Sequence, residues 1–250
     1  MKIARVQVEG GIYTARIEGD TAHLLEGDVF DRPIEMGRAV PLSAARLLIP
    51  CVPTKIIAIG INYKSHAGDR PAPGDPQGFL KAPSSLIAHG EAIVLPADST
   101  NVHMEAEVVA VIGRQAKGIT EAEVDAHVFG YTAGNDVSAR DWQQSDLQWL
   151  RAKSSDTFSA VGPWIETDLT PEAISVAGRI SGRTQQESDT SLLIHSIRKC
   201  IAHVSRYVTL EPGDLIYTGT PGQTSAVVAG DTCEVEVGGV GILRNPVRQG

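Results

Sequence analysis

Short runs of alternating apolar and polar residues, each ended by glycine, dominate the first 50 residues. Residues 2–10, 11–19 and 21–27 read KIARVQVEG, GIYTARIEG and TAHLLEG. A period of two places apolar side chains on one face of a strand, and glycine favours the turns between neighbouring strands. The pattern predicts a small N-terminal β-rich domain over residues 1–50, followed by a main domain over residues 51–250.

Longer apolar runs in the main domain also have the character of strands. They are KIIAIGINY (55–63), HMEAEVVAVIG (103–113), VFGYTAGNDVS (128–138), LEPGDLIYTGT (210–220) and TCEVEVGGVGIL (232–243). These strands outnumber the helices that the sequence predicts, and no regular βαβ alternation is present. We therefore expect a mixed, β-rich α+β fold.

Two helices are predicted from capping signals alone. Thr120 and Glu123 have the spacing of a capping box ahead of a short helix over residues 121–127. Ser138 and Asp141 have the same spacing ahead of a helix through RDWQQSDLQWL. Both helices would lie directly beside predicted strands.

Two more helices are predicted from proline placement and from periodicity. Thr170-Pro171-Glu172 would place proline at the first helical position. The clearest helix is SLLIHSIRKCIAHVSRYV (191–208), and its apolar residues at three- and four-residue spacing form one stripe. That stripe consists of Leu193, Ile197, Ile201 and Val204.

Residues 66–78 read HAGDRPAPGDPQG and lack apolar side chains that could anchor them to a core. Glycine and proline at this density indicate a segment without regular structure. Such a segment is either an inert surface loop or a mobile lid over a site, and composition alone leaves both alternatives open.

Composition excludes some classes of function. Of the 250 residues, 42% are apolar and 21% are charged, which is typical of a globular domain. The net charge of −8 without a basic cluster argues against nucleic-acid binding. No apolar run is long enough to span a bilayer, and the N-terminus does not resemble a signal peptide. The three scattered cysteines predict neither disulfides nor a thiolate metal site, and we expect a cytoplasmic enzyme without a membrane partner.

Glu105 and Glu107 are the sharpest local signal for chemistry. Residues two apart on a strand point to the same face, which Val109 and Val111 extend as an apolar stripe. A hard cation such as Mg²⁺ or Mn²⁺ would relieve the repulsion between two such carboxylates, and Asp136 after the next strand could complete the set. The alternative is that the glutamates are hydrated at a strand end and that Asp136 is an ordinary turn residue.

His66, Asp69 and Lys153 are weaker candidates for catalysis. A carboxylate three residues from a histidine can face it on a helical turn and raise its basicity, as a general base requires. Lys153 lies in RAKSSDTF between two apolar segments. A solvated histidine and an ordinary surface lysine remain the alternatives.

Seven segments of the chain together resemble the fumarylacetoacetate hydrolase family. In order, they read GINYKSHAGD, GFLKAPSSLI, HMEAEVVAVIG, GYTAGNDVSARDWQ, RAKSSDTFSAVGPW, TSLLIHSI and LEPGDLIYTGTPGQ. They cover roughly residues 55 to 240 in the order found in that family. The resemblance extends to its bacterial acylpyruvate hydrolase and 2-hydroxyhepta-2,4-diene-1,7-dioate isomerase members.

The resemblance implies a specific architecture and site. It implies a β-roll with flanking helices, a lid over about residues 62–78, a homodimer, and Mg²⁺ or Mn²⁺ as the cofactor, with Ca²⁺ as a third candidate in a crystal. The implied metal ligands are Glu105, Glu107 and Asp136, the catalytic residues are His66, Asp69 and Lys153, and the substrate-binding residues are Arg140, Gln143, Gln186 and Thr220. Many relatives have glutamate where this chain has the shorter Asp69.

The activity that the resemblance implies is hydrolysis of a C–C bond in a small acylpyruvate or another 1,3-dicarbonyl 2-oxo acid, through a metal-bound enolate. Decarboxylation of an oxaloacetate-type substrate and keto–enol isomerisation of a 2-hydroxy-dienoate are alternatives, because both pass through the same enolate. A lyase or hydratase on the same fold and a catalytically silent binding relative are the remaining alternatives.

Overall fold

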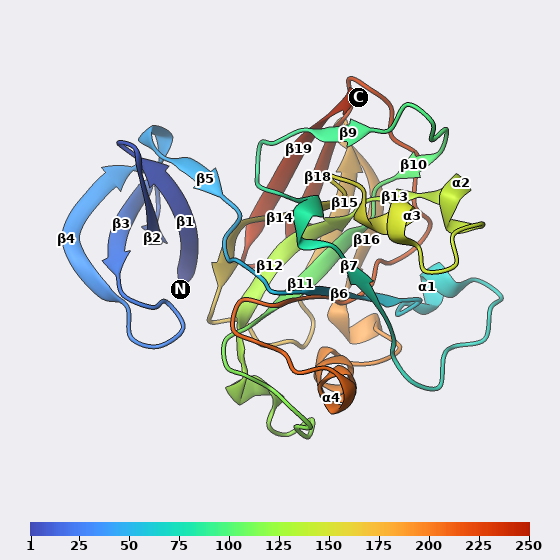
Figure 1. The fold of residues 1–250 in the computed structure, drawn as a ribbon, viewed down its shortest axis with the longest axis horizontal. Coiled ribbons are helices and arrows are strands. Elements are labelled where there is room, and N and C mark those ends of the chain that lie inside the picture. The colour runs from blue at the N-terminus through green and yellow to red at the C-terminus, as the bar shows by residue number, and fades with distance from the viewer.

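The computed structural model describes residues 1–250 and consists mostly of β-strands (Figure 1). The strands are β1 (Lys2–Val8), β2 (Gly11–Glu18), β3 (Thr21–Glu26), β4 (Ile34–Pro41), β5 (Arg46–Leu48), β6 (Ile56–Gly60), β7 (Gln77–Lys81), β8 (Leu86–Ile87), β9 (Ile93–Leu95), β10 (Val102–His103), β11 (Ala106–Ile112), β12 (Val128–Asp136), β13 (Ser138–Ala139), β14 (Ser159–Glu166), β15 (Ser175–Ile180), β16 (Arg183–Asp189), β17 (Leu215–Tyr217), β18 (Thr232–Val237) and β19 (Gly241–Gln249). The α-helices are α1 (Lys64–Ala67), α2 (Arg140–Gln143), α3 (Leu150–Ser154) and α4 (Ile197–Tyr207). No helix is both long and apolar enough to cross a membrane. The predicted β-rich class is confirmed.

The first four strands form an antiparallel meander at one side of the molecule (Figure 1). Seven buried apolar residues give the meander a core of its own, and Val6, Ile17 and Leu24 are among them. β1 pairs with β14 through Lys2 and Ile3 only. The meander therefore joins the rest of the molecule along a short seam.

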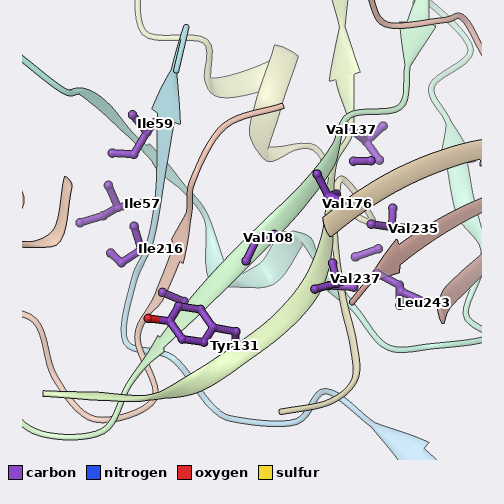
Figure 2. Packing of buried hydrophobic residues seen from close by; sticks show 14 of the residues in the cluster. Ile57, Ile59, Val108, Tyr131, Val137, Val176, Ile216, Val235, Val237 and Leu243 are labelled. Carbon is purple, nitrogen blue, oxygen red and sulfur yellow. The ribbon is translucent and has the colours of Figure 1, made fainter. Parts of the chain in front are cut away.

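Most strands, including those of the meander, belong to two sheets, and β10 pairs with β13 in a small third sheet. The larger sheet has the strand order β4-β3-β2-β1-β14-β12-β11-β17-β6-β7, and the second sheet has the order β16-β15-β18-β19-β9. A cluster of 36 buried residues fills the space between them. Figure 2 shows this packing: Val108 and Tyr131 from the larger sheet lie near Val176, Val235 and Val237 from the second.

Strand β11 is buried on both faces, and every one of its residues is at most 2% exposed. Val108 and Ile112 belong to the cluster between the sheets, whereas Val109 and Val111 belong to a second cluster on the opposite face. Glu107 alternates with Val108 and therefore shares the face of Val109 and Val111. This is the arrangement that the sequence predicts for the glutamates.

The helix predicted over residues 191–208 is shorter in the structure, because α4 begins only at Ile197. The side chain and backbone of Asn62 hold the preceding residues in an extended path. The carbonyl of Asn62 accepts the N–H of Ile194 at 2.7 Å, and its side-chain oxygen accepts the N–H of His195 at 2.9 Å. A contact with a distant residue thus overrides the local helical pattern.

The helix predicted to continue from Ser138 is divided into α2 and α3. The Ser138 hydroxyl donates to the carbonyl of Asp136 at 2.8 Å rather than capping a helix. Between the two helices, Asp146 accepts from the guanidinium of Arg151 at 2.6 Å and from the N–H of Ala152 at 3.3 Å. Side chains that bind nearby backbone groups compete with helical hydrogen bonds, and here they end the helix early.

The two other predicted helices are wrong. Residues 121–127 contain only a 3₁₀ turn at Val124–Ala126, although the capping contact ahead of it forms. The chain does not enter a helix after Pro171, because Ala173 has a φ of 56°. A left-handed residue at that position is incompatible with a right-handed helix.

Candidate active site

Three carboxylates from neighbouring strands meet at one end of the larger sheet. Glu105 immediately precedes β11, Glu107 lies within it, and Asp136 ends β12. The two strands are antiparallel with Ala106 opposite Asn135, so the start of one lies beside the end of the other. One oxygen from each carboxylate lies within 4.8 Å of the others, and the three residues are only 3%, 2% and 1% exposed. The alternative of hydrated glutamates is wrong, because water has almost no access to them.

Three cations contact these carboxylates. The ammonium of Lys153 donates to Glu105 at 2.6 Å and to Asp136 at 2.7 Å. Lys81 forms an ion pair with Asp136, and Arg140 forms one with Glu105. Both lysines are buried, so the alternative of a surface position for Lys153 is also wrong. The formal charges of three carboxylates and three cations sum to zero.

The cations are unevenly distributed, and the pKa values follow that distribution. Glu107 has no cation partner and accepts only the N–H of Gly219, at 2.7 Å. Burial, together with the charges of Asp136 and Glu105, raises the pKa of Glu107 well above its usual range. Burial lowers the pKa of Lys153, but the same two carboxylates outweigh it and the net pKa is raised. Lys153 therefore remains an ammonium group that can donate hydrogen bonds.

His66 reaches the same site from α1. Its Nδ1 lies 2.8 Å from the carbonyl oxygen of Gly222. A carbonyl can only accept, so Nδ1 carries the hydrogen when the ring is neutral, and Nε2 retains its lone pair. Nε2 lies 4.0 Å from the carboxylate of Glu105. In the neutral ring, the nitrogen that can accept a proton is therefore the one that faces Glu105.

The predicted contact between His66 and Asp69 is not formed. α1 is a single turn that ends at Ala67, and Gly68 has a φ of 59°, so the chain leaves the helical path before Asp69. Asp69 is exposed and makes neither a hydrogen bond nor an ion pair with His66. The three-residue spacing aligns side chains only on a continuing helix. In this structure, the carbonyl of Gly222 orients the imidazole instead.

The carboxylates and His66 line a cavity of about 620 Å³. Three of the predicted substrate-binding residues, Arg140, Gln143 and Thr220, also line it. Gln186 does not, because it lies buried behind the wall. Its side-chain nitrogen donates to the hydroxyl of Thr220 at 2.7 Å, and its side-chain oxygen accepts the N–H of Ala106 at 3.0 Å. Gln186 therefore holds the loop after β17 against β11.

Lys81 is the main site residue that the sequence analysis missed. It ends β7 inside an apolar run, and it is buried because its ammonium donates to the carbonyl of Phe158 at 3.0 Å as well as pairing with Asp136. Burial lowers the pKa of this ammonium, while Asp136 opposes the shift. A lysine within an apolar strand was the available signal, since a buried lysine requires a carboxylate partner.

The donor set fits a divalent metal ion. Carboxylate oxygens are the ligands that Mg²⁺ and Mn²⁺ prefer, and three of them converge here within one cluster. Glu107 is the one carboxylate of the three that has no cation partner in the protein. A dication bound by Glu105, Glu107 and Asp136 would place positive charge beside Glu107.

Comparison with known proteins identifies the family. A family model described as fumarylacetoacetate hydrolase, C-terminal, matches residues 55–248, and an N-terminal model described as Rv2993c-like matches residues 1–50. Protein Rv2993c of Mycobacterium tuberculosis is 42% identical over 99% of this chain and 98% of its own length. A mitochondrial oxaloacetate tautomerase, fahd2 of Xenopus laevis, is 38% identical over 80% of this chain and 68% of its length.

Solved structures share the whole fold. A 5-carboxymethyl-2-hydroxymuconate delta-isomerase from Mycobacterium smegmatis is 42% identical and superposes with a TM-score of 0.95, with full coverage of both chains. A maleylpyruvate hydrolase from Sphingobium sp. SYK-6, in complex with manganese(II) and pyruvate, is 27% identical with a TM-score of 0.82 over both full chains. These relatives are enzymes with different reactions on one fold. By sequence and by structure, the chain belongs to the fumarylacetoacetate hydrolase family.

Proposed function

We propose that this protein is a divalent-metal-dependent hydrolase that cleaves a C–C bond in a small acylpyruvate or another 1,3-dicarbonyl 2-oxo acid. The observation that carries the proposal is the position of His66. Its Nε2 lies 4.0 Å from Glu105, in the same cavity as the carboxylate cluster. A base beside a site for a 2-oxo acid is what hydrolysis requires, because a water molecule must be activated there.

Glu105, Glu107 and Asp136 would hold Mg²⁺ or Mn²⁺. When bound, the ion acts as a Lewis acid toward the carboxylate and keto oxygens of a 2-oxo acid. The relative that was solved with manganese(II) and pyruvate supports both the ion and the class of ligand.

In the proposed reaction, Nε2 of His66 takes a proton from water while the water oxygen bonds to the carbonyl carbon distal to the 2-oxo acid. The C–C bond then breaks, and its electron pair remains on the 2-oxo acid fragment, which becomes an enolate. The hydrogen bond from Nδ1 to Gly222 fixes the tautomer that can accept the proton. Lys153, which donates hydrogen bonds to Glu105 and Asp136 and lines the cavity, would offset negative charge on the substrate oxygens. Transfer of the proton from Nε2 of His66 to the enolate carbon then gives pyruvate and restores the neutral imidazole, and the acyl fragment leaves as a carboxylic acid.

Keto–enol tautomerisation is the second candidate. The oxaloacetate tautomerase and the delta-isomerase among the relatives support it, because both reactions need the enolate and a proton shuttle but no attacking water. Decarboxylation of oxaloacetate reaches the same enolate by loss of CO₂. His66 would then move a proton to or from carbon instead of activating water.

The test is turnover of the purified protein with Mg²⁺ or Mn²⁺, and again with EDTA, on acetylpyruvate and on oxaloacetate. We expect stoichiometric pyruvate and acetate from acetylpyruvate, and loss of this activity with EDTA. Enol–keto conversion of oxaloacetate without any cleavage of acetylpyruvate would contradict the proposed hydrolysis and support tautomerisation. Metal binding without turnover of either substrate would indicate a non-catalytic relative.

A further inference from the structure

Arg70 lines the cavity and lies three residues after the end of α1. Its guanidinium is oriented by backbone carbonyls of the segment that carries His66. Nε donates to the carbonyl of Ala67 at 3.1 Å, and an Nη donates to the carbonyl of His66 at 3.3 Å. Arg70 and the imidazole are thus held together on one short segment.

These two hydrogen bonds leave part of the guanidinium unused. Arginine has five N–H donors, so three remain, including both on the other Nη. The two Nη atoms form the edge that binds a carboxylate through two parallel hydrogen bonds. The side chain is exposed toward the cavity and the solvent rather than packed in the core.

Arg70 differs in charge balance from the other cations at the cavity. Lys153 contacts two carboxylates and Arg140 contacts Glu105, so neither carries an uncompensated charge. Arg70 forms no ion pair with any residue of the chain, although Asp69 is its neighbour in sequence. An arginine without an acidic partner, in a protein with a net charge of −8, is a local attractor for an anion.

The charges of the site also leave Arg70 without a role at the reacting end of the substrate. The three carboxylates and the cations Lys81, Lys153 and Arg140 sum to zero, so a bound dication would give a charge of +2. The enolate of a 2-oxo acid carries two negative charges, one on its carboxylate and one on its enolate oxygen. The reacting end is therefore balanced without Arg70, which remains available for a third negative charge.

The cavity provides room for a substrate that reaches from the carboxylates to this arginine. Its volume of about 620 Å³ lies in the range of sites that enclose whole small-molecule ligands. The apolar lining consists of Ile59, Ile61, Phe79 and Trp149. The rings of Phe79 and Trp149 pack edge to face with centroids 5.2 Å apart. A short carbon chain could lie against these side chains between two charged ends.

We propose that Arg70 is a specificity-determining residue that binds a terminal carboxylate of the substrate, so that the protein prefers 2-oxo acids with a second, distal carboxylate. The inference rests on the proposed function for the location of the 2-oxo acid end. It concerns binding, and it holds equally for hydrolysis and for tautomerisation.

The test uses ligands that bind without being cleaved. Linear 2-oxo dicarboxylates of five to seven carbons lack the 1,3-dicarbonyl group, and each is paired with the 2-oxo monocarboxylate of equal length. Titration calorimetry with the Mg²⁺-loaded protein should show that the dicarboxylate binds about five- to tenfold more tightly at the length that reaches Arg70, as expected for a partly exposed, bidentate ion pair. This advantage should decrease as the salt concentration is raised.

Arg70→Met should reduce the difference within that pair to about twofold or less and leave the monocarboxylate affinity unchanged, because only the ion pair is removed. Arg32→Met is the matched control, since Arg32 is exposed in the N-terminal meander and has no side-chain partner. Equal affinity of the two ligands at every length would overturn the proposal. An equal loss for both ligands in Arg70→Met, or the same loss in Arg32→Met, would also overturn it.

Failure of the proposed function is a separate result. Hydrolysis of acetylpyruvate, which has no distal carboxylate, tests the reaction without involving Arg70. If the protein discriminates between the paired ligands but does not hydrolyse acetylpyruvate, the role of Arg70 is supported and only the proposed reaction is contradicted. If it hydrolyses acetylpyruvate but binds the paired ligands equally well, the proposed reaction is supported and the role of Arg70 is contradicted.

Discussion

The floor and the rim of the cavity are built in different ways. The floor consists of Glu105, Glu107, Asp136 and Lys153, with Lys81 behind Asp136, and all five are at most 3% exposed. The rim consists of single-turn α1 and the loop after β17, which meet at His66 and Gly222. Buried and mutually paired groups tolerate little change, whereas an exposed turn can change without loss of the core. We therefore expect substitutions in the floor to impair metal binding more than substitutions on the rim.

Removal of one floor carboxylate should have the largest effect. Glu107→Gln keeps the size and the hydrogen bond from Gly219 but removes the negative charge that a dication needs. We expect loss of Mn²⁺ binding and a fall in turnover of about 10³-fold or more, since the metal supplies several kcal/mol of charge stabilisation. Electron paramagnetic resonance of Mn²⁺ measures the binding directly. An unchanged thermal unfolding temperature without metal would show that the fold persists, and full Mn²⁺ binding would contradict the assignment of this ligand.

Removal of the base on the rim should affect the reaction but not the metal. His66→Ala should lower hydrolysis of acetylpyruvate by about 10²- to 10⁴-fold, the usual contribution of a positioned general base. Mn²⁺ affinity should stay within about twofold, because His66 is not among the carboxylate ligands. An equal loss of metal affinity would show that His66 helps to bind the metal, and the floor and the rim would then not differ in this function.

Lys81 tests whether the floor depends on its buried cation. Lys81→Met retains the length of the side chain but removes the ion pair with Asp136 and the hydrogen bond to Phe158. We expect about a 10- to 100-fold loss of turnover, because groups that orient a metal ligand usually contribute that much. The measurement is kcat at saturating metal and substrate, with circular dichroism as the check on folding. Activity equal to that of the unmodified protein would show that Lys153 alone suffices.

Substitution of Asp69, which lies just beyond the end of α1, should have the smallest effect on hydrolysis. Asp69 is exposed and does not contact His66, whose orientation depends on Gly222. Asp69→Asn should therefore lower hydrolysis by less than about threefold, as expected for a surface charge. A loss close to that of His66→Ala would show that the dyad predicted from the sequence forms when substrate binds. Comparison with oxaloacetate turnover, which needs no activated water, would distinguish a base from a general effect.

Local sequence patterns predicted features within a strand or helix correctly but were misleading at its ends. The alternation around Glu105 and Glu107 predicted their shared face, because the period of a strand is fixed by its backbone geometry. The spacing of His66 and Asp69 was misleading, because it presupposes a helix that ends at Ala67. The helix expected from residue 191 starts at Ile197, because Asn62 binds the residues before it. Periodicity is therefore informative within an element but not at its ends, where distant residues decide.

The sequence by itself determined the β-rich class, the common face of the two glutamates and the resemblance to a family of enzymes. These depend on local backbone geometry or on ordered sequence blocks. Only the tertiary structure decided that the glutamates are buried, that Lys81 and Lys153 approach Asp136, and that Arg70 faces the cavity without a partner. Burial and charge pairing arise between residues that are far apart in the chain, so they exist only after the strands have assembled.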